Sequence, residues 1–456
     1  MIPGSHVTVD VDFGNWLAEL TERVNRAQCF QRLGAVQEVV GLTVVSQGPP
    51  AQVGETCYVR PAMDRPPVRA QVVGFRDSRV LLMPLGDTRG IHPGCEVVAT
   101  GQQVSVPVGP QLLGRIVDGF GVPLDGRGAL NVAQRRGVYA EAPRPMDRIR
   151  MNEPLHLGVR AIDTLLTCAR GQRIGIFAGS GLGKSTLLGM IARNSSADVN
   201  VVALVGERGR EVMDFVEGKL GPSLERSVVV VATADEPALV RLQAGFAATA
   251  IAEEFRDRGA HVMLMMDSLT RLARAQREVG LAAGEIPVNR GFPPSVFAMI
   301  PSLVERAGPS ARGTISGMYA VLVEGDDMLE PVADTARATL DGHIVLTRDL
   351  AEKGHYPAID VNGSISRAMA SVVDDTHRQL CEKARRLLRG YADIEDLVAI
   401  GAYEAGGDPW VDAAVAVHPQ MSEFLSQAID ERAQPADALV RLQEIVQAAE
   451  RIVADR

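Results

Sequence analysis

The stretch that decides the fold of this chain is Gly175-Ile176-Phe177-Ala178-Gly179-Ser180-Gly181-Leu182-Gly183-Lys184-Ser185-Thr186-Leu187-Leu188. It predicts the end of a strand, a glycine-rich turn and the start of a helix. Residues 178–185 fit the pattern A-x-x-x-x-G-K-S, a phosphate-binding loop with alanine at its first position. Glycine permits backbone angles that other residues avoid, so successive N–H groups of this turn can face phosphate oxygens.

The residue types of the turn suit the binding of a nucleotide. Lys184 is expected to reach the outer phosphates and the Ser185 hydroxyl to ligate Mg²⁺, while the helix that begins there directs its positive end to the same place. A glycine-rich turn that binds nothing is the alternative, but the β-rich residues before it and the apolar residues after it disfavour that interpretation. The predicted nucleotide-binding residues are Gly179, Ser180, Gly181, Leu182, Gly183, Lys184, Ser185 and Thr186.

The composition excludes several classes of protein. The 456 residues are 46% hydrophobic and 23% charged, which is ordinary for a globular chain with a large core. The net charge of −9 argues against a dedicated nucleic-acid binder, and no nucleic-acid partner is expected. The five cysteines lie far apart without C-x-x-C spacing, as in a cytosolic protein with reduced thiols. The N-terminus has no signal-segment pattern, and no apolar run is long enough to span a bilayer.

Two different patterns precede the phosphate loop. Residues 13–27 have apolar positions at helical spacing, which predicts an amphipathic helix within an N-terminal arm, residues 1–28. This helix either packs on its own domain or docks on a partner or membrane, and its mixed charge favours packing. Residues 29–100 predict a small β-barrel domain with few aromatic residues, unlike a base-stacking surface. Its β-rich runs are 35–45, 55–59, 70–75, 80–84 and 96–99.

The remainder predicts an α/β domain followed by helices. The α/β domain is predicted to cover residues 101–370, and its first part, up to residue 150, consists of turn-rich connectors. Apolar strands then alternate with helices, which indicates a phosphate-loop NTPase core with a mostly parallel sheet. Residues 371–456 predict an all-helical C-terminal domain. The expected strands are 171–177, 199–205, 227–232, 261–266, 315–323 and 343–346, and the expected helices begin at 184 or cover 237–258, 375–390, 393–403, 410–430 and 436–453.

Two strand ends supply carboxylates near the predicted phosphate site. The strand at 261–266 leads into Asp267, and an acid after four apolar residues is the pattern that holds Mg²⁺ beside a phosphate loop. The strand at 199–205 leads to Glu207, which can polarise an attacking water. The alternative is that Glu207 and Glu211 pair with Arg208 and Arg210 on a solvated turn. Glu211 is expected to be structural.

Residue chemistry alone leaves the roles of Tyr356 and Arg367 open. An aromatic residue before proline suits either a core position or stacking on an adenine ring. A lone arginine is usually a surface residue or a partner in an ion pair.

Seven stretches between about residues 110 and 370 resemble the type III secretion ATPases of flagellar export systems and injectisomes. They follow one another in the same order as in that family. These are relatives of the catalytic beta subunit of F-type ATP synthase. GERGRE and PPSVF are the most specific of the shared motifs. The stretches are LLGRIVDGFG (112–121), GQR (171–173), FAGSGLGKSTLLGMIAR (177–193), VGERGREVMDFVE (205–217), MMDSLTRLARAQRE (265–278), RGFPPSVFAMIPSLVERAG (290–308) and GHYPAIDVNGSISR (354–367).

The resemblance implies a Mg²⁺-dependent ATPase that energises protein export and releases or unfolds chaperone-bound substrates. It matches Lys184 and Ser185 to the phosphate lysine and the Mg²⁺ hydroxyl. Glu207, with Arg208 beside it, matches the catalytic glutamate, and Asp267 matches the Mg²⁺-associated aspartate. By the same resemblance, Tyr356 matches an adenine-stacking tyrosine, and Arg367 matches an arginine finger offered to a neighbouring subunit.

The resemblance also implies an assembly and its partners. Because Glu207 and Arg367 occur in one sequence, identical copies could lend Arg367 to one another, which predicts a homo-oligomer, most simply a hexameric ring. The implied partners are export-gate, stalk and stator proteins, together with secretion chaperones and their substrates at the C-terminal helices. The implied location is cytoplasmic, at the cytoplasmic face of the secretion apparatus, with peripheral association with the inner membrane.

The sequence departs from ATP synthase at the helical end. Residues 403–412 read YEAGGDPWVD and lack the acidic run by which the synthase subunit touches its central stalk. This difference, with GERGRE in place of GERTRE, disfavours the rival interpretation of a catalytic subunit of a proton-coupled rotary ATP synthase. Glu207 stands where regulatory, non-hydrolysing subunits typically carry glutamine. A ring helicase that acts on RNA is expected to have aromatic and basic strands near the N-terminus. The sequence lacks them, which disfavours that function.

Overall fold

The computed structural model describes Thr21 and residues 32–61 and 65–455. The chain divides into two compact units, residues 1–102 and 103–456, and each is described by itself. The helix predicted at 13–27, and the arm 1–28 that contains it, lie outside the described residues apart from Thr21, so both stay predictions.

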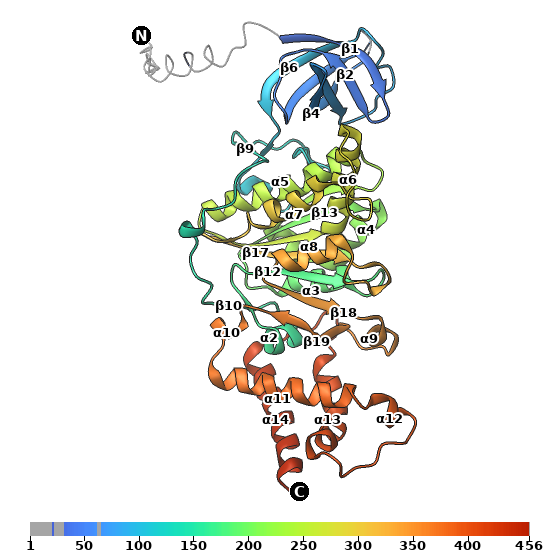
Figure 1. Cartoon of the computed structure of the whole chain (residues 1–456). Coiled ribbons are helices and arrows are strands. Elements are labelled where there is room, and N and C mark those ends of the chain that lie inside the picture. Colours follow the sequence, from blue (N-terminus) through green and yellow to red (C-terminus); the bar gives the residue numbers. More distant parts are fainter. Residues whose placement is uncertain (1–20, 22–31, 62–64, 456) are drawn as a thin grey trace, which may run out of the picture. The chain divides into compact units, whose positions relative to one another are not determined.

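The first unit is a closed barrel with the strand order β1-β2-β5-β4-β3-β6 (Figure 1). Its core is built from inward-facing side chains such as Val44, Val59, Leu82 and Val97, because alternate residues of a strand point to opposite faces. The small barrel predicted from the sequence is therefore confirmed. The strands are β1 Arg32–Val40, β2 Thr43–Gln47, β3 Glu55–Arg60, β4 Val68–Arg76, β5 Arg79–Pro84 and β6 Glu96–Gln103.

One predicted run of the barrel is wrong, because residues 35–45 are not a single strand. They form most of a hairpin in which Val40 lies opposite Thr43. The chain reverses at Gly41, whose φ of +56° is a left-handed conformation that favours glycine. Val40 and Leu42 flank that glycine, so the turn lacks the polar residues by which a turn is usually predicted.

The second unit is built on a nine-stranded sheet with the order β19-β18-β12-β17-β15-β13-β14-β8, and β16 pairs with β17. The neighbours are parallel except for β18 with β19 and β16 with β17, so the predicted, mostly parallel sheet is confirmed. The strands are β8 Ile116–Asp118, β12 Arg173–Ala178, β13 Val199–Glu207, β14 Ser227–Thr233, β15 His261–Asp267, β16 Gly308–Pro309, β17 Thr314–Leu322, β18 Gly342–Leu346 and β19 Ile359–Ser366.

Helices cover both faces of this sheet (Figure 1). Val202 and Leu204 of β13 belong to the hydrophobic cluster that also contains Leu187 and Leu188 of α3. The opposite face of β13, β14 and β15 packs against α5. Burial on both faces explains the nearly continuous apolar strands. The helices are α2 Arg160–Leu165, α3 Lys184–Asn194, α4 Gly209–Met213, α5 Ala238–Asp257, α6 Leu269–Ala283, α7 Pro294–Val304, α8 Pro331–Thr339, α9 Arg348–Glu352 and α10 Met369–Val372.

The sequence did not predict several elements, among them the helices α6, α7 and α8 and a number of strands. Within the connectors at 101–150, β8 forms the edge strand of the central sheet. The same connectors contain a separate two-stranded sheet, made of β7 Ser105–Pro107 and β9 Arg135–Gly137. β19 and the small pair β10 Pro154–Leu155 with β11 Cys168–Ala169 were also missed. A two- or three-residue strand shows no periodicity, so only its pairing partner reveals it.

The C-terminal helices share their core with the sheet domain. α11, α13 and α14 pack on α2, and their buried residues belong to the same cluster as the residues of α3. The Cys381 thiol donates a 3.0 Å hydrogen bond to the Thr164 carbonyl. The predicted helical region is confirmed, and the domain boundary at 370–371 stays a prediction. The helices are α11 Asp375–Ala392, α12 Glu395–Ala399, α13 Pro409–Leu425 and α14 Pro435–Ala454.

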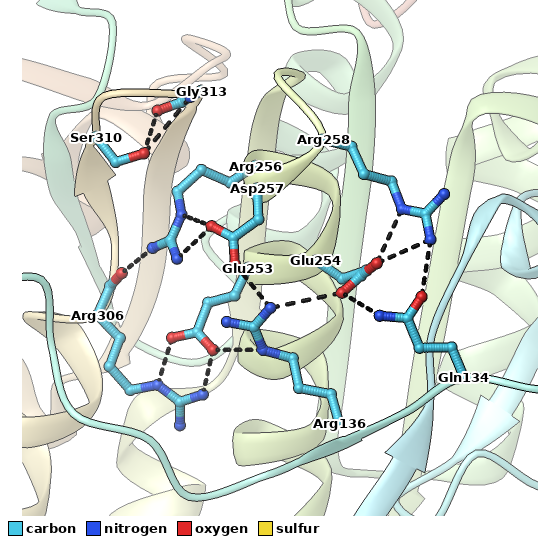
Figure 2. Close-up of polar contacts among 10 residues, drawn as sticks. All are labelled: Gln134, Arg136, Glu253, Glu254, Arg256, Asp257, Arg258, Arg306, Ser310 and Gly313. Atoms are coloured by element: carbon cyan, nitrogen blue, oxygen red, sulfur yellow. Dashed lines mark hydrogen bonds and ion pairs between the residues drawn. The ribbon is translucent and has the colours of Figure 1, made fainter. Parts of the chain in front are cut away.

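A network of ion pairs ties the β9 segment to α5 and to the residues after α7 (Figure 2). The Arg306 guanidinium donates two 2.8 Å hydrogen bonds to the Glu253 carboxylate, and both side chains are almost fully buried. Arg136 reaches the same carboxylate at 3.4 Å and that of Asp257 at 2.8 Å. Buried charges are tolerated when they are paired in this way.

Candidate functional site

The phosphate loop joins β12 to α3, as the sequence predicts. Gly181 and Gly183 have φ values of +82° and +85°, where a side chain would be strained although open space surrounds both positions. Gly183 precedes the first helical residue, Lys184, and no side chain caps this helix end. The first N–H groups of α3 are therefore left for an anionic ligand.

Lys184, Ser185 and Asp267 meet at the carboxyl ends of the strands. The Lys184 ammonium pairs with one oxygen of the Asp267 carboxylate, and the Ser185 hydroxyl donates a 3.1 Å hydrogen bond to the other. Asp267 is 1% exposed and Lys184 8%. They come together because β12 and β15 both pair with β17 in parallel, so their carboxyl ends lie at the same edge of the sheet.

Glu207 lies at the end of β13, beside β15, and is 7% exposed. Arg271, in the first turn of α6, donates hydrogen bonds to the Glu207 carboxylate at 3.1 Å and to the Gly206 carbonyl. Glu207 is therefore not part of a solvated turn, and the alternative in which it pairs with Arg208 or Arg210 is wrong. Arg208 pairs with Glu211 at 3.2 Å instead.

The electrostatics of Glu207 differ from those of an exposed glutamate. Burial raises the pKa of its carboxyl, and a hydrogen bond with Glu211 and the nearby charge of Asp267 raise it further. Arg271 and Lys184 oppose that shift. The same hydrogen bond lowers the pKa of Glu211. The hydrogen bond between the two glutamates thus shifts their pKa values in opposite directions, and Glu211 takes part in the electrostatics of the site.

These side chains line a single cavity of about 400 Å³. The cavity contains both the phosphate loop and the carboxylates that follow β13 and β15, as expected for a ligand site at the carboxyl edge of a parallel sheet. Its lining residues are Gly179, Ser180, Gly181, Gly183, Lys184, Ser185, Thr186, Leu204, Glu207, Arg208, Glu211, Asp214, Phe215, Lys219, Asp267, Arg271 and Leu322.

The residues of the cavity fit a nucleotide with Mg²⁺. The uncapped start of α3 and the Lys184 ammonium suit phosphate oxygens. The Ser185 hydroxyl and the Asp267 carboxylate are hard oxygen ligands, which Mg²⁺ prefers. Within the described part of the chain no three His, Cys, Asp or Glu side chains form a metal cluster.

Three predicted site residues lie outside this cavity. The Leu182 side chain is 4% exposed and belongs to the hydrophobic core. Tyr356 is 48% exposed, and its carbonyl accepts a 2.9 Å hydrogen bond from the Gln427 N–H. Arg367 is exposed just after β19, and its N–H donates to the Asp341 carbonyl at 3.0 Å. Tyr356 and Arg367 therefore stand at the surface of a single copy.

The cavity also contains functional candidates that the sequence did not predict, namely Arg271 and Lys219, and it gives Glu211 a role beyond structure. Arg271 carries a signal that could have been used, because Ser268 caps α6 and so brings Arg271 into the first turn after Asp267. Lys219 has no such local signal.

Three family models match the chain. The nucleotide-binding domain of the ATP synthase alpha/beta family matches residues 158–366, and the beta-barrel domain of the same family matches residues 36–101. The C-terminal domain of the type III secretion ATPase EscN matches residues 373–444.

A whole-chain relative decides the assignment. The chain is 49% identical over 425 residues to the "Flagellum-specific ATP synthase" of Bacillus subtilis, which covers 93% of this chain and 97% of the relative. The chain belongs to the type III secretion and flagellar export ATPases. Within the described residues, no helix of this export ATPase is both long and apolar enough to cross a membrane.

Solved structures agree with this assignment. The assembled ATPase EscN of the enteropathogenic E. coli type III secretion system has a TM-score of 0.86 and 44% identity, covering 91% of this export ATPase and all of that chain. EscN in complex with its central stalk EscO gives a TM-score of 0.84 at 43% identity, with the same coverage. The family and the ATPase activity expected from the sequence are thereby confirmed.

Proposed function

We propose that this export ATPase hydrolyses Mg²⁺-bound ATP in the cavity at the carboxyl edge of the sheet, and that turnover releases or unfolds chaperone-bound substrates of a flagellar or injectisome apparatus. One observation carries the proposal: Lys184, Ser185, Asp267 and Glu207 come from three different elements and line one cavity. The rival of a proton-coupled rotary ATP synthase subunit is disfavoured by the match of the helical end to the EscN C-terminal model.

Each residue has a role that its surroundings support. Lys184 and the start of α3 bind the outer phosphates, and Ser185 with Asp267 would hold Mg²⁺, which neutralises charge that develops on the phosphates. With a nucleotide bound, the Lys184 ammonium would contact phosphate oxygens in place of the Asp267 carboxylate. Glu207 orients and polarises the attacking water, and Arg271 holds the Glu207 carboxylate in place. Arg208 stands beside it at the rim.

Two exposed residues outside the cavity are assigned to contacts with the nucleotide. Arg367 acts as a finger on the nucleotide of a neighbouring copy, since a finger supplied in trans is worth ~10³ or more in rate. Tyr356 stacks on the adenine ring. The exposed side chain of Arg367, away from the cavity of its own copy, supports this reading. A hexameric ring follows, because head-to-tail contacts close by rotation.

The partners and location follow from family membership. The proposed partners are export-gate, stalk and stator proteins, and chaperones with their substrates bound at the C-terminal helices. The solved complex of EscN with EscO supports a stalk partner. The proposed location is the cytoplasmic face of the secretion apparatus, peripheral to the inner membrane.

The test is a charge-neutral variant of Glu207. Glu207→Gln keeps the shape and hydrogen bonding of the side chain but cannot polarise water as a carboxylate does. We expect ATP binding to be retained and steady-state hydrolysis to fall by about two orders of magnitude or more. Glu217→Gln, an exposed change ten residues along the same segment, is the matched control. Parental turnover by Glu207→Gln would overturn the assignment of Glu207.

A further inference from the structure

Lys219 places a second lysine in the nucleotide cavity. It lies in the π-helix η3 Asp214–Leu220, which follows α4 and packs against α3. The approach is close: a Cβ added to Gly189 of α3 would lie 2.7 Å from the Lys219 Cβ. Glycine within a helix costs about 1 kcal/mol relative to alanine. At position 189 it lets the Lys219 stem lie directly on the backbone of the helix that carries Lys184.

The Lys219 ammonium has no partner among the described residues. It makes no hydrogen bond or ion pair there, and its nearest aromatic contact is the Phe215 ring, whose centroid is 6.0 Å from the nitrogen. The other cations of the cavity are paired, Lys184 with Asp267, Arg271 with Glu207 and Arg208 with Glu211. Among the described residues that line the cavity, Lys219 is therefore the cationic side chain that remains available for an anionic ligand.

The surroundings of the ammonium indicate which part of a ligand it would meet. Burial lowers the pKa of Lys219, so its charged form lacks the solvation that it would have in water. The charges of Asp267, Asp214, Glu211 and Glu207 oppose that shift. Asp267 and Glu207 are the carboxylates assigned to the metal and to the attacking water. Lys219 lines the same cavity as these two carboxylates.

We propose that Lys219 binds the terminal phosphate of ATP as a second phosphate lysine and so makes the site prefer ATP to ADP. This inference rests on the proposed function, because it takes the cavity as the ATP site. An ammonium without a counterion gains a charge-assisted hydrogen bond when a phosphate oxygen arrives. ADP lacks that phosphate and leaves Lys219 unpaired.

The test compares two nucleotides across matched variants. Lys219→Met keeps an unbranched side chain that packs against Gly189 but removes the positive charge. Lys219→Gln also removes the charge and places a polar amide at the end of the side chain. Lys219→Arg keeps the charge. Arg210→Met removes a positive charge from an exposed side chain that does not line the cavity. Each full-length variant is titrated with a non-hydrolysable ATP analogue and with ADP, both with Mg²⁺.

We expect Lys219→Met and Lys219→Gln to bind the ATP analogue about tenfold or more weakly and to change ADP affinity by less than about threefold. Lys219→Arg should keep most of the preference, and Arg210→Met should keep all of it. Equal loss for both nucleotides, or unchanged affinity for the ATP analogue, would overturn the role of Lys219. Turnover of the parental chain is measured alongside: its absence would contradict the proposed function, whereas parental turnover with an unmoved ATP preference contradicts only this inference.

Discussion

His261 shows how one buried side chain makes stability depend on pH. It begins β15, and its Nε2 lies 2.9 Å from the Ser316 hydroxyl, which also accepts a hydrogen bond from the Gly171 N–H. Burial lowers the pKa of His261 to about 4. The unfolded chain takes up this proton near the ordinary value of about 6.5, whereas the folded chain does not.

Stability should therefore fall as the pH drops from about 6.5 to about 4, by up to about 1.4 kcal/mol per pH unit from this one group. His261→Gln keeps a polar side chain but cannot titrate, so we expect a shallower decline in this window. Urea unfolding midpoints between pH 8 and pH 4.5 measure the effect. His92→Gln, at an exposed barrel position, should leave the decline unchanged. Parallel pH curves for His261→Gln and the parental chain would contradict this account.

Single residues could be predicted from the sequence where a local pattern fixes their surroundings. Lys184 and Ser185 follow from their place at a helix start, and Asp267 from its place after an apolar strand. The partners of Glu207 could not be predicted, because Arg271 and Glu211 reach it through the folding of two segments that follow different strands. The place of Lys219 in the cavity could not be predicted either. It depends on the close approach of η3 to α3 at Gly189, and the sequence of neither segment indicates that contact.

At the scale of elements, the ion pairs in Figure 2 hold β9, α5 and the end of α7 together. Arg306 bonds to both Glu253 oxygens and also donates a 2.7 Å hydrogen bond to the Val138 carbonyl. Removing Arg306 leaves the buried Glu253 carboxylate only partly compensated by Arg136, 3.4 Å away. The network should therefore contribute more to the free energy of unfolding than the sum of its individual hydrogen bonds.

Arg306→Met should lower the free energy of unfolding by about 3–5 kcal/mol, which is the usual cost of breaking a buried pair from one side. The double variant Arg306→Met/Glu253→Leu removes both charges and should lose less than the single variant. Arg337→Met breaks the more exposed pair with Asp334 and should cost at most about 1 kcal/mol. Urea denaturation of the three variants distinguishes these values. A loss by Arg306→Met no larger than that of Arg337→Met would contradict the role of the pair.

Several long elements were predictable from the sequence, but the 15-residue helix α6 and the eight-residue strand β19 were missed along with the short ones. β13, β15 and α5 are continuous apolar or amphipathic runs, and they lie close to where the patterns predict them. The hairpin at Gly41 was missed because its turn is apolar. The π-helix η3 was also missed; it spans only seven residues and packs against α3.

At the scale of the whole molecule, the residues proposed for catalysis are divided between the cavity and the surface. Glu207 lines the cavity, and Arg367 is exposed outside it. If each copy completes the site of its neighbour, a mixture of two inactive variants should recover activity. Arg367→Ala and Glu207→Gln should each bind ATP and hydrolyse it poorly. Mixed rings contain some interfaces with an intact Glu207 facing an intact Arg367.

We expect the mixture to regain a measurable part of parental turnover, and the specific activity of the parental chain to rise with protein concentration as rings assemble. Native mass spectrometry checks that mixed rings form. The double variant carrying both changes in one chain, mixed with itself, is the control that should stay inactive. Mixed rings without recovered activity would show that Arg367 does not act across the interface.

The closed barrel has a consequence for the proposed ring of identical copies. Each of its six strands already has a neighbour on both sides, so the described strands offer no free edge on which a strand from another copy could add. Copies crowded into an assembly can therefore touch through this unit without exchanging strands. Such contacts rely on side chains alone, which keeps them reversible and guards the crowded state against the growth of cross-β fibres.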